Sequence, residues 1–211
     1  MAETIPLVPS NVYHLYNHAN GSENLFREHE NYRYFLKKYT EYVFPLAETF
    51  AYCLLPNHVH FMIRMRDEGC LTRYFLEKRK DPPGLEDLAG LLSREFGHFF
   101  NAYAKAYNER YDRRGSLFEK PFKRKPVEDE GYFTSLIAYI HNNPLHHGFV
   151  KGIDQWPHSS WFSYLSDKPT KIAREEGLAW FGGREEFVKF HHEASNLDPP
   201  GFQNLEGLGA L

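Results

Sequence analysis

Residues Thr49–Arg66 read TFAYCLLPNHVHFMIRMR, and this stretch determines the fold that the sequence predicts. Two segments rich in aliphatic and aromatic residues flank the dipeptide Pro56-Asn57, which favours a tight turn. Short apolar runs on either side of such a turn are typical of a β-hairpin. We therefore predict two antiparallel strands, Thr49–Leu55 and His58–Arg66.

The sequence on both sides of the hairpin predicts further strands and helices. Polarity alternates over Val12–Ala19, as in a strand, and apolar residues recur at helical spacing over Glu28–Phe44. After the break at residues 81–84 (DPPG), a second helical pattern covers Leu85–Tyr107. A fourth strand is expected within Leu117–Val127. These elements alternate as β-α-β-β-α-β.

One more helix is expected over Glu128–Asn143, with acidic residues at its start and Pro144 ending it. The complete order predicts an α+β fold. We expect a ferredoxin-like antiparallel sheet (β-α-β-β-α-β) with helices packed on one face, followed by this additional helix and a C-terminal extension.

The regular pattern of strands and helices ends at about Gly148. We therefore predict a domain at 8–150 and an extension at 151–211 that packs on it. Trp156–Trp161 resembles an irregular packed segment, and Arg184–Ala194 predicts a short helix. The tail after Asn196 is rich in Gly and Pro and is expected to be loosely ordered.

Composition restricts the class of protein. With 211 residues, 42% of them hydrophobic and 25% charged, the chain can form a packed core. It contains neither a long apolar run nor a signal-peptide pattern at the N-terminus, which predicts a cytoplasmic protein without a membrane partner. Cys53 and Cys70 are the two cysteines, and their spacing excludes a disulfide scaffold and a thiolate zinc site.

The charge is uneven along the chain although the net charge is only −3. Positions 105–125 contain eight basic and three acidic residues, a net charge of +5. Five aromatic residues are interleaved with these basic residues or flank them. Basic side chains next to aromatic rings suit the binding of single-stranded nucleic acid. The alternative is that the segment is a solvated basic loop. The candidate DNA-binding residues are Lys105, Arg110, Arg113, Arg114, Lys120, Lys123, Arg124 and Lys125.

The segment His58-Val59-His60 is the sharpest local signal. Because side chains alternate along a strand, both imidazoles project from the face opposite Val59 and Phe61. Two neutral imidazoles on alternate residues can chelate a divalent cation. The alternative is a pair of half-exposed polar residues with no ligand.

The helix before Pro144 offers two more candidate residues. Tyr139 and Asn143 are four positions apart and so share one helix face, with Tyr132 about two turns earlier on the same side. An amide oxygen suits a hard cation. Alternatively, Asn143-Pro144 is only a helix stop and Tyr139 a partly buried ring with a solvated hydroxyl.

Taken together, two separated motifs resemble a known family. They are YCLLPNHVH at 52–60 and YIHNNP at 139–144, supported by YHLYN at 13–17, GSLF at 115–118 and WPHSS at 156–160. This combination resembles the single-tyrosine HUH transposases, and within them most closely the REP-associated tyrosine transposases. The similarity extends over about Val12–Tyr164, so the 8–150 domain is expected to be the catalytic domain and its last helix the catalytic helix.

The resemblance implies specific roles. His58, His60 and Asn143 would bind Mg²⁺ or Mn²⁺, with Asn143 where insertion-sequence relatives often have Gln, and Tyr139 would be the nucleophile. Such enzymes cut and rejoin single-stranded DNA at hairpins through a 5′-phosphotyrosine, so DNA hairpins are the implied partner. Both a homodimer and a monomer are compatible with the resemblance.

Three alternatives remain open from the sequence. The chain could be a non-catalytic DNA-hairpin-binding regulator of the same fold. It could be a metal-dependent hydrolase that uses the His58–His60 pair and an activated water, which would not need Tyr139. It could also be a structural protein in which the histidines are coincidental.

Overall fold

The predicted hairpin is confirmed in the computed structural model, which describes residues 5–79 and 85–195. Strand β2 (Ala47–Leu54) pairs antiparallel with β3 (His58–Met65), with Leu54 opposite Val59. The turn is closed by the Leu55 N–H, which donates to the His58 carbonyl at 2.8 Å. The predicted break at 81–84 and the tail after Asn196 lie outside the described residues.

The hairpin belongs to a four-stranded sheet with the order β2-β3-β1-β4. Strand β1 (Val12–His18) lies between β3 and β4 (Lys123–Pro126) and pairs antiparallel with both. Together with the helices between the strands, this confirms the α+β class and the ferredoxin-like sheet. The sheet places β1 and β3 at its centre.

The fourth strand is much shorter than the predicted Leu117–Val127. Pro121 has no N–H to donate to a ladder, which restricts regular pairing upstream of β4. The earlier part of the segment lies beside the end of β1: Phe118 forms an isolated bridge with Ala19, and the Glu119 N–H donates to the His18 carbonyl at 2.9 Å. Residues 117–122 therefore run along the edge of the sheet as a loop.

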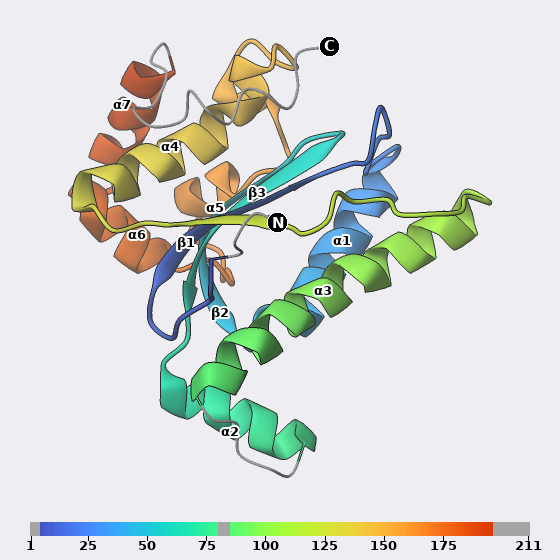
Figure 1. Cartoon of the computed structure of the whole chain (residues 1–211). Coiled ribbons are helices and arrows are strands. Elements are labelled where there is room, and N and C mark those ends of the chain that lie inside the picture. Colours follow the sequence, from blue (N-terminus) through green and yellow to red (C-terminus); the bar gives the residue numbers. More distant parts are fainter. Residues whose placement is uncertain (1–4, 80–84, 196–211) are drawn as a thin grey trace.

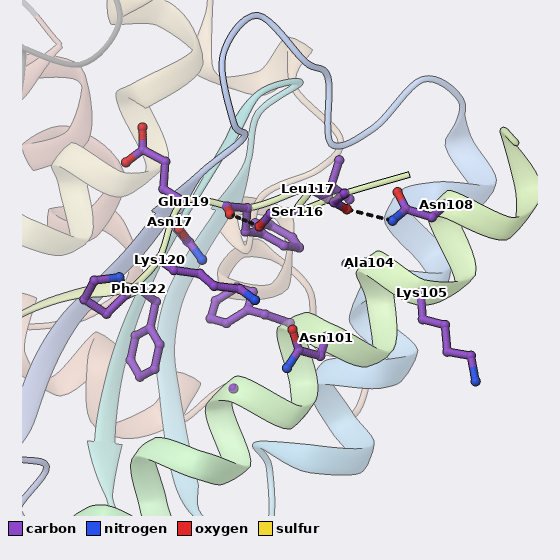
Figure 2. Close-up of a pocket in the computed structure, with 15 residues that line it drawn as sticks. Asn17, Asn101, Ala104, Lys105, Asn108, Ser116, Leu117, Glu119, Lys120 and Phe122 are labelled. Atoms are coloured by element: carbon purple, nitrogen blue, oxygen red, sulfur yellow. Dashed lines mark hydrogen bonds between the residues drawn. The ribbon is translucent and has the colours of Figure 1, made fainter. Parts of the chain in front are cut away.

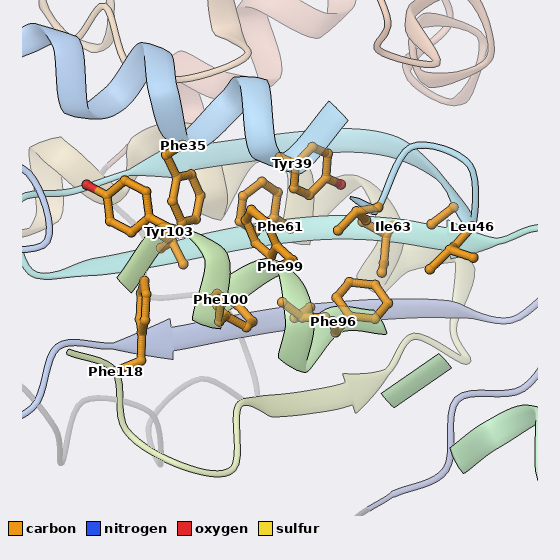
Figure 3. Packing of buried hydrophobic residues seen from close by; sticks show 14 of the residues in the cluster. Phe35, Tyr39, Leu46, Phe61, Ile63, Phe96, Phe99, Phe100, Tyr103 and Phe118 are labelled. Atoms are coloured by element: carbon orange, nitrogen blue, oxygen red, sulfur yellow. The ribbon is translucent and has the colours of Figure 1, made fainter. Parts of the chain in front are cut away.

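One face of the sheet is covered by α1 (His29–Tyr42) and α3 (Leu85–Arg110), as predicted (Figure 1). The core between them is largely aromatic (Figure 3). Phe61 of β3 stacks on Tyr39 with ring centroids 4.5 Å apart, and Phe35 meets Tyr103 edge-to-face at 4.9 Å. The high aromatic content of the sequence thus fills this layer.

Helix α2 (Glu68–Arg79) between β3 and α3 was not predicted. Its sequence, EGCLTRYFLEKR, is mostly polar, and of its residues only Leu71 and Phe75 are buried hydrophobics of the described core. Two buried apolar residues in a short segment give too weak a periodicity for a helix prediction.

None of the described helices is long and apolar enough to cross a bilayer.

The opposite face of the sheet carries α4 (Glu130–His146) and the C-terminal elements (Figure 1). These are a 3₁₀ turn η1 (Ile153–Gln155), then α5 (Trp161–Leu165), α6 (Arg174–Phe181) and α7 (Arg184–Ala194). A second apolar cluster joins residues of β2 and β3 to α4 and to this C-terminal segment. The sheet is therefore buried on both faces.

The prediction that Pro144 ends its helix is wrong. The proline lies inside α4, which continues to His146. A proline inside a helix loses the hydrogen bond that its own N–H would have donated, and its ring crowds the carbonyl of the residue four positions earlier. Here both effects fall near the end of α4, which continues only two residues past Pro144. The last turn remains helical, and the His147 N–H still donates to the Asn143 carbonyl at 3.0 Å.

A chain of buried hydrogen bonds fastens α4 to α7. His191 Nδ1 lies 2.7 Å from the Phe187 carbonyl, which only accepts, so Nδ1 carries the proton and Nε2 is an acceptor. His141 Nδ1 must then donate to His191 Nε2 at 2.9 Å, and its Nε2 accepts from the Ser160 hydroxyl at 2.7 Å. Asn142 adds a bond from Nδ2 to the His191 carbonyl at 3.0 Å.

This network predicts a pH dependence of stability. Burial lowers the pKa of His191 to about 3, from an ordinary value of 6.5. Between these values the unfolded chain binds a proton that the folded protein does not, so the free energy of unfolding is highest above pH 6.5 and falls as the pH decreases. One such histidine contributes about 1.4 kcal/mol per pH unit.

We expect the loss of stability from about pH 7 to about pH 5, measured by urea unfolding, to be smaller in His191→Gln than in the wild type, because one titrating group has been removed. His192→Gln is the matched control, since the neighbouring side chain is exposed. An identical loss in the wild type and His191→Gln would contradict the assignment.

Candidate metal and tyrosine site

The two histidines of β3 lie on the sheet face that α4 covers. Val59 and Phe61 point into the aromatic core with α1 and α3, whereas His58 and His60 alternate with them and face the other way. Both imidazoles are buried, at 3% and 4% exposure, and their ring centroids are 5.1 Å apart. The strand thus presents the pair together, as its alternation predicted.

Helix α4 brings the other two predicted residues to the same place within one chain. Asn143 Oδ1 lies 3.1 Å from His58 Nε2, and the ring centroid of Tyr139 lies 5.8 Å from that of His60. Asn143 is fully buried and Tyr139 half-buried. Because the two residues are one helical turn apart, packing α4 on the sheet places both beside the histidine pair.

Both histidines are neutral at physiological pH. Burial, followed by the neighbouring His18, lowers the pKa of His58 to about 3. Burial and the nearby His14 likewise hold the pKa of His60 well below its ordinary value. A neutral imidazole keeps a lone pair for a metal ion, so these two side chains are available as ligands.

The hydrogen bonds of His58 show which nitrogen is available. His58 Nδ1 donates to Asn57 Oδ1 at 2.8 Å, which leaves a lone pair on Nε2. That lone pair faces Asn143 Oδ1, so two acceptors meet at 3.1 Å. A cation between them would make both of them ligands, whereas an Asn143 amide rotated by half a turn would donate an N–H to Nε2 instead.

The donor set fits a divalent cation but contains no carboxylate. No cluster of three or more His, Cys, Asp or Glu side chains suited to a metal occurs in residues 5–79 and 85–195. The candidate ligands are therefore two imidazole nitrogens and one amide oxygen. The amide oxygen suits a hard cation such as Mg²⁺ or Mn²⁺, whereas imidazole nitrogens more often bind borderline transition-metal ions.

His14 of β1 completes the group and was not predicted as a site residue. Its Nε2 lies 2.9 Å from His60 Nδ1, and the two rings stack at 5.1 Å. His14 is fully buried and also meets the Tyr139 ring edge-on at 6.2 Å. Strand alternation could have placed His14 and His18 on one face, but the pairing of β1 with β3 is not readable from the sequence.

Tyr132, the other tyrosine on this side of α4, has different surroundings. Its ring lies under Lys125, whose Nζ is 5.2 Å from the ring centroid, and burial raises the pKa of its hydroxyl to about 12. The described ring contacts with His14 and His60 are made by Tyr139 instead. Of the two tyrosines on this side of α4, Tyr139 is therefore the one beside the candidate ligands. Tyr16 of β1 also stacks on His60, with ring centroids 5.9 Å apart.

The eight basic residues of the 105–125 segment do not form one free surface. Arg124 is turned toward α3, is 9% exposed and donates to Ser93 Oγ at 3.0 Å, so it supports the fold and offers little to DNA. Three others pair with carboxylates: Arg110 with Glu28 at 2.7 Å, Arg113 with Glu23 at 2.8 Å and Lys123 with Glu119 at 3.4 Å.

The other four basic residues are exposed and form no salt bridge with any residue that the structure describes. They are Lys105, Arg114, Lys120 and Lys125. The ion pairs thus separate these four residues from the other predicted DNA contacts, and the DNA-binding role of all eight stays a prediction. Local charge in the sequence could not show this, since the partners Glu23 and Glu28 are more than 80 residues away.

Comparison with known proteins agrees with the motifs. No family model matches the chain. The chain is similar to a putative REP-associated tyrosine transposase of Haemophilus influenzae, with 26% identity over 116 residues, which cover 54% of this chain and 58% of that protein. The match thus spans little more than half the length of the curated relative.

The fold is similar to a solved structure of a REP-associated tyrosine transposase bound to a REP hairpin. The TM-score is 0.58 at 16% identity, and the match covers 82% of this chain and 92% of that chain. The resemblance to the REP-associated tyrosine transposases, predicted from the motifs, is therefore confirmed.

The site predicts binding of a metal ion without DNA. We expect Mn²⁺, titrated calorimetrically, to bind the protein, and His58→Ala or His60→Ala to weaken binding more than about tenfold, because loss of an outer partner of a ligand alone costs 10- to 100-fold. His98→Ala removes an exposed histidine and should leave the affinity unchanged. Equal affinities in all variants would exclude these ligands.

Proposed function

We propose that the chain is a transposase that cuts and rejoins single-stranded DNA at hairpins through a covalent bond to Tyr139. The main observation behind this proposal is that Tyr139 lies beside His60 and that Asn143 of the same helix lies against His58. The curated relative and the solved neighbour are both named REP-associated tyrosine transposases, and the neighbour is bound to a REP hairpin.

The proposed reaction exchanges one phosphodiester bond for another. The Tyr139 hydroxyl oxygen bonds to the scissile phosphorus and loses its proton, while the bond from phosphorus to the 3′-oxygen breaks and that oxygen takes up a proton. The products are a 5′-phosphotyrosine and a free 3′-hydroxyl, and attack by a 3′-hydroxyl reverses the step. No ATP is required, in keeping with a sequence that has no Walker A loop.

Tyrosine needs assistance as a nucleophile, since an ordinary phenol has a pKa of about 10. A divalent cation held by His58, His60 and Asn143 would polarise the scissile phosphate and stabilise negative charge on its oxygens. These three residues carry no charge, so none of them repels the phosphate. Helix α4 holds the Tyr139 ring at this place, which supplies the proximity that such a reaction requires.

His14 would orient His60 in this site. If His60 binds a metal through Nε2, its Nδ1 carries the proton and donates to His14 Nε2. Burial lowers the pKa of His14 to about 3, so its Nε2 can act as a neutral acceptor. His14 is therefore a positioning residue, which fixes the tautomer of the ligand without touching the DNA.

The nucleophile is tested by trapping the covalent product. We expect Tyr139→Phe to abolish the SDS-resistant adduct with a labelled single-stranded DNA carrying a hairpin, because the attacking oxygen is absent, while binding of the DNA is retained. Tyr132→Phe is the matched control on the same helix and should still form the adduct.

Other outcomes would favour the other functions. Binding without cleavage by the wild type would indicate a regulator that only holds hairpins. Cleavage without an adduct would indicate a hydrolase with activated water. An adduct that survives in Tyr139→Phe would place the nucleophile elsewhere.

The role of His14 is tested by two substitutions that differ in one property. His14→Phe keeps a ring but removes the acceptor, and we expect about 10- to 100-fold weaker Mn²⁺ binding by calorimetry. His14→Gln retains an acceptor oxygen and should recover part of the affinity. Similar affinities for the two variants would mean that His14 acts only through packing.

A further inference from the structure

A second concave site lies on the other side of the sheet from the histidines. It is a cavity of about 700 Å³ between α3 and the loop that precedes β4 (Figure 2). Helix α3 contributes Asn101, Ala104 and Lys105 to its lining, and the loop contributes residues 115–122. Its volume lies in the range of pockets that hold small organic molecules or parts of larger ones.

The inner wall of the cavity is aromatic. Phe100 and Phe118 are buried with ring centroids 4.9 Å apart, and the half-buried Phe122 lies 5.7 Å from Phe100. All three rings line the cavity. A flat aromatic group of a ligand, such as a nucleobase, can pack against such a wall.

The rim of the cavity is positively charged. Lys105 and Lys120 are both exposed, line the cavity and form no salt bridge with a residue that the structure describes. The one carboxylate in the lining, Glu119, is paired with Lys123 at 3.4 Å. The rim therefore offers two uncompensated cations to a phosphate.

Amide groups complete the lining. Asn17 Oδ1 accepts from the His18 N–H at 3.0 Å, so its NH₂ group is the part left to donate to a ligand. Asn101 is exposed at the mouth, whereas Asn108 is occupied by a bond to the Gly115 carbonyl at 2.9 Å that holds the loop (Figure 2). Amides of this kind hydrogen-bond to the edges of unpaired bases.

We propose that this cavity binds one unpaired nucleotide of the DNA substrate, with the base against the aromatic wall and the phosphate at Lys105 and Lys120. The inference rests on the proposed function, since it takes the same DNA as its ligand. Strand β1 connects the two sites: Asn17 lines the cavity, and the next residue, His18, stacks on His58 at 4.6 Å on the other face. The two sites therefore adjoin the same end of β1.

The test compares a blunt DNA hairpin with the same hairpin carrying four unpaired deoxyadenosines at its 5′ or its 3′ end. By fluorescence anisotropy, we expect the wild type to bind at least one extended hairpin about tenfold more tightly than the blunt one, the effect of about one stacked base. Ala104→Trp, which fills the cavity, should lose this preference and keep its affinity for the blunt hairpin.

Ala102→Trp is the matched control, because Ala102 lies on the same helix but does not line the cavity. If Ala104→Trp fails to fold, Lys120→Gln provides the second variant, and it should reduce the salt slope by about one more for the extended hairpin than for the blunt one. The proposal is overturned if no extension improves wild-type binding, or if Ala104→Trp or Lys120→Gln behaves as the wild type. The Tyr139 adduct is measured separately, so a failure here is distinguishable from a failure of the proposed function.

Discussion

The antiparallel register between β1 and β3 is the constraint on which the candidate site depends. It places His18 opposite His58 and Tyr16 opposite His60, so their rings share the face under α4. A shift of one residue would turn His58 and His60 into the aromatic core and turn Phe61 toward α4. Burial of apolar side chains on both faces of the sheet opposes such a shift, and the positions of the ligands therefore follow from the packing of the core.

The second requirement is a fixed position for α4, and the C-terminal segment provides it. His141 and Asn142, which lie between Tyr139 and Asn143 in the sequence, both bond to His191 of α7. These bonds lie in a buried region where an unsatisfied polar group is costly, so they define one orientation of the helix about its axis. The face that carries Tyr139 and Asn143 is thereby directed at the histidine pair.

The sequence could predict what depends on local pattern. Alternation along β3 predicted the shared face of His58 and His60, and helical spacing predicted that of Tyr139 and Asn143. Contacts between distant segments could not be predicted in this way: the bond of His14 to His60 depends on strand register, and the pairing of Arg110 with Glu28 on the packing of α3 beside α1. The continuation of α4 through Pro144 was missed because proline is more often a stop than an interior residue.

The charge around the candidate site differs from the net charge of −3 of the whole chain. The candidate ligands His58, His60 and Asn143 are neutral side chains, so they add no negative charge to the site. Strand β4 adds cations by the same alternation that arranges the histidines: Lys123 and Lys125 lie opposite Tyr16 and His14, on the site face, while Arg124 turns into the core. Lys123 is paired with Glu119 at 3.4 Å, whereas Lys125 is exposed and forms no salt bridge with a residue that the structure describes. A phosphate that approaches this face would therefore meet the charge of Lys125 despite the negative net charge of the chain.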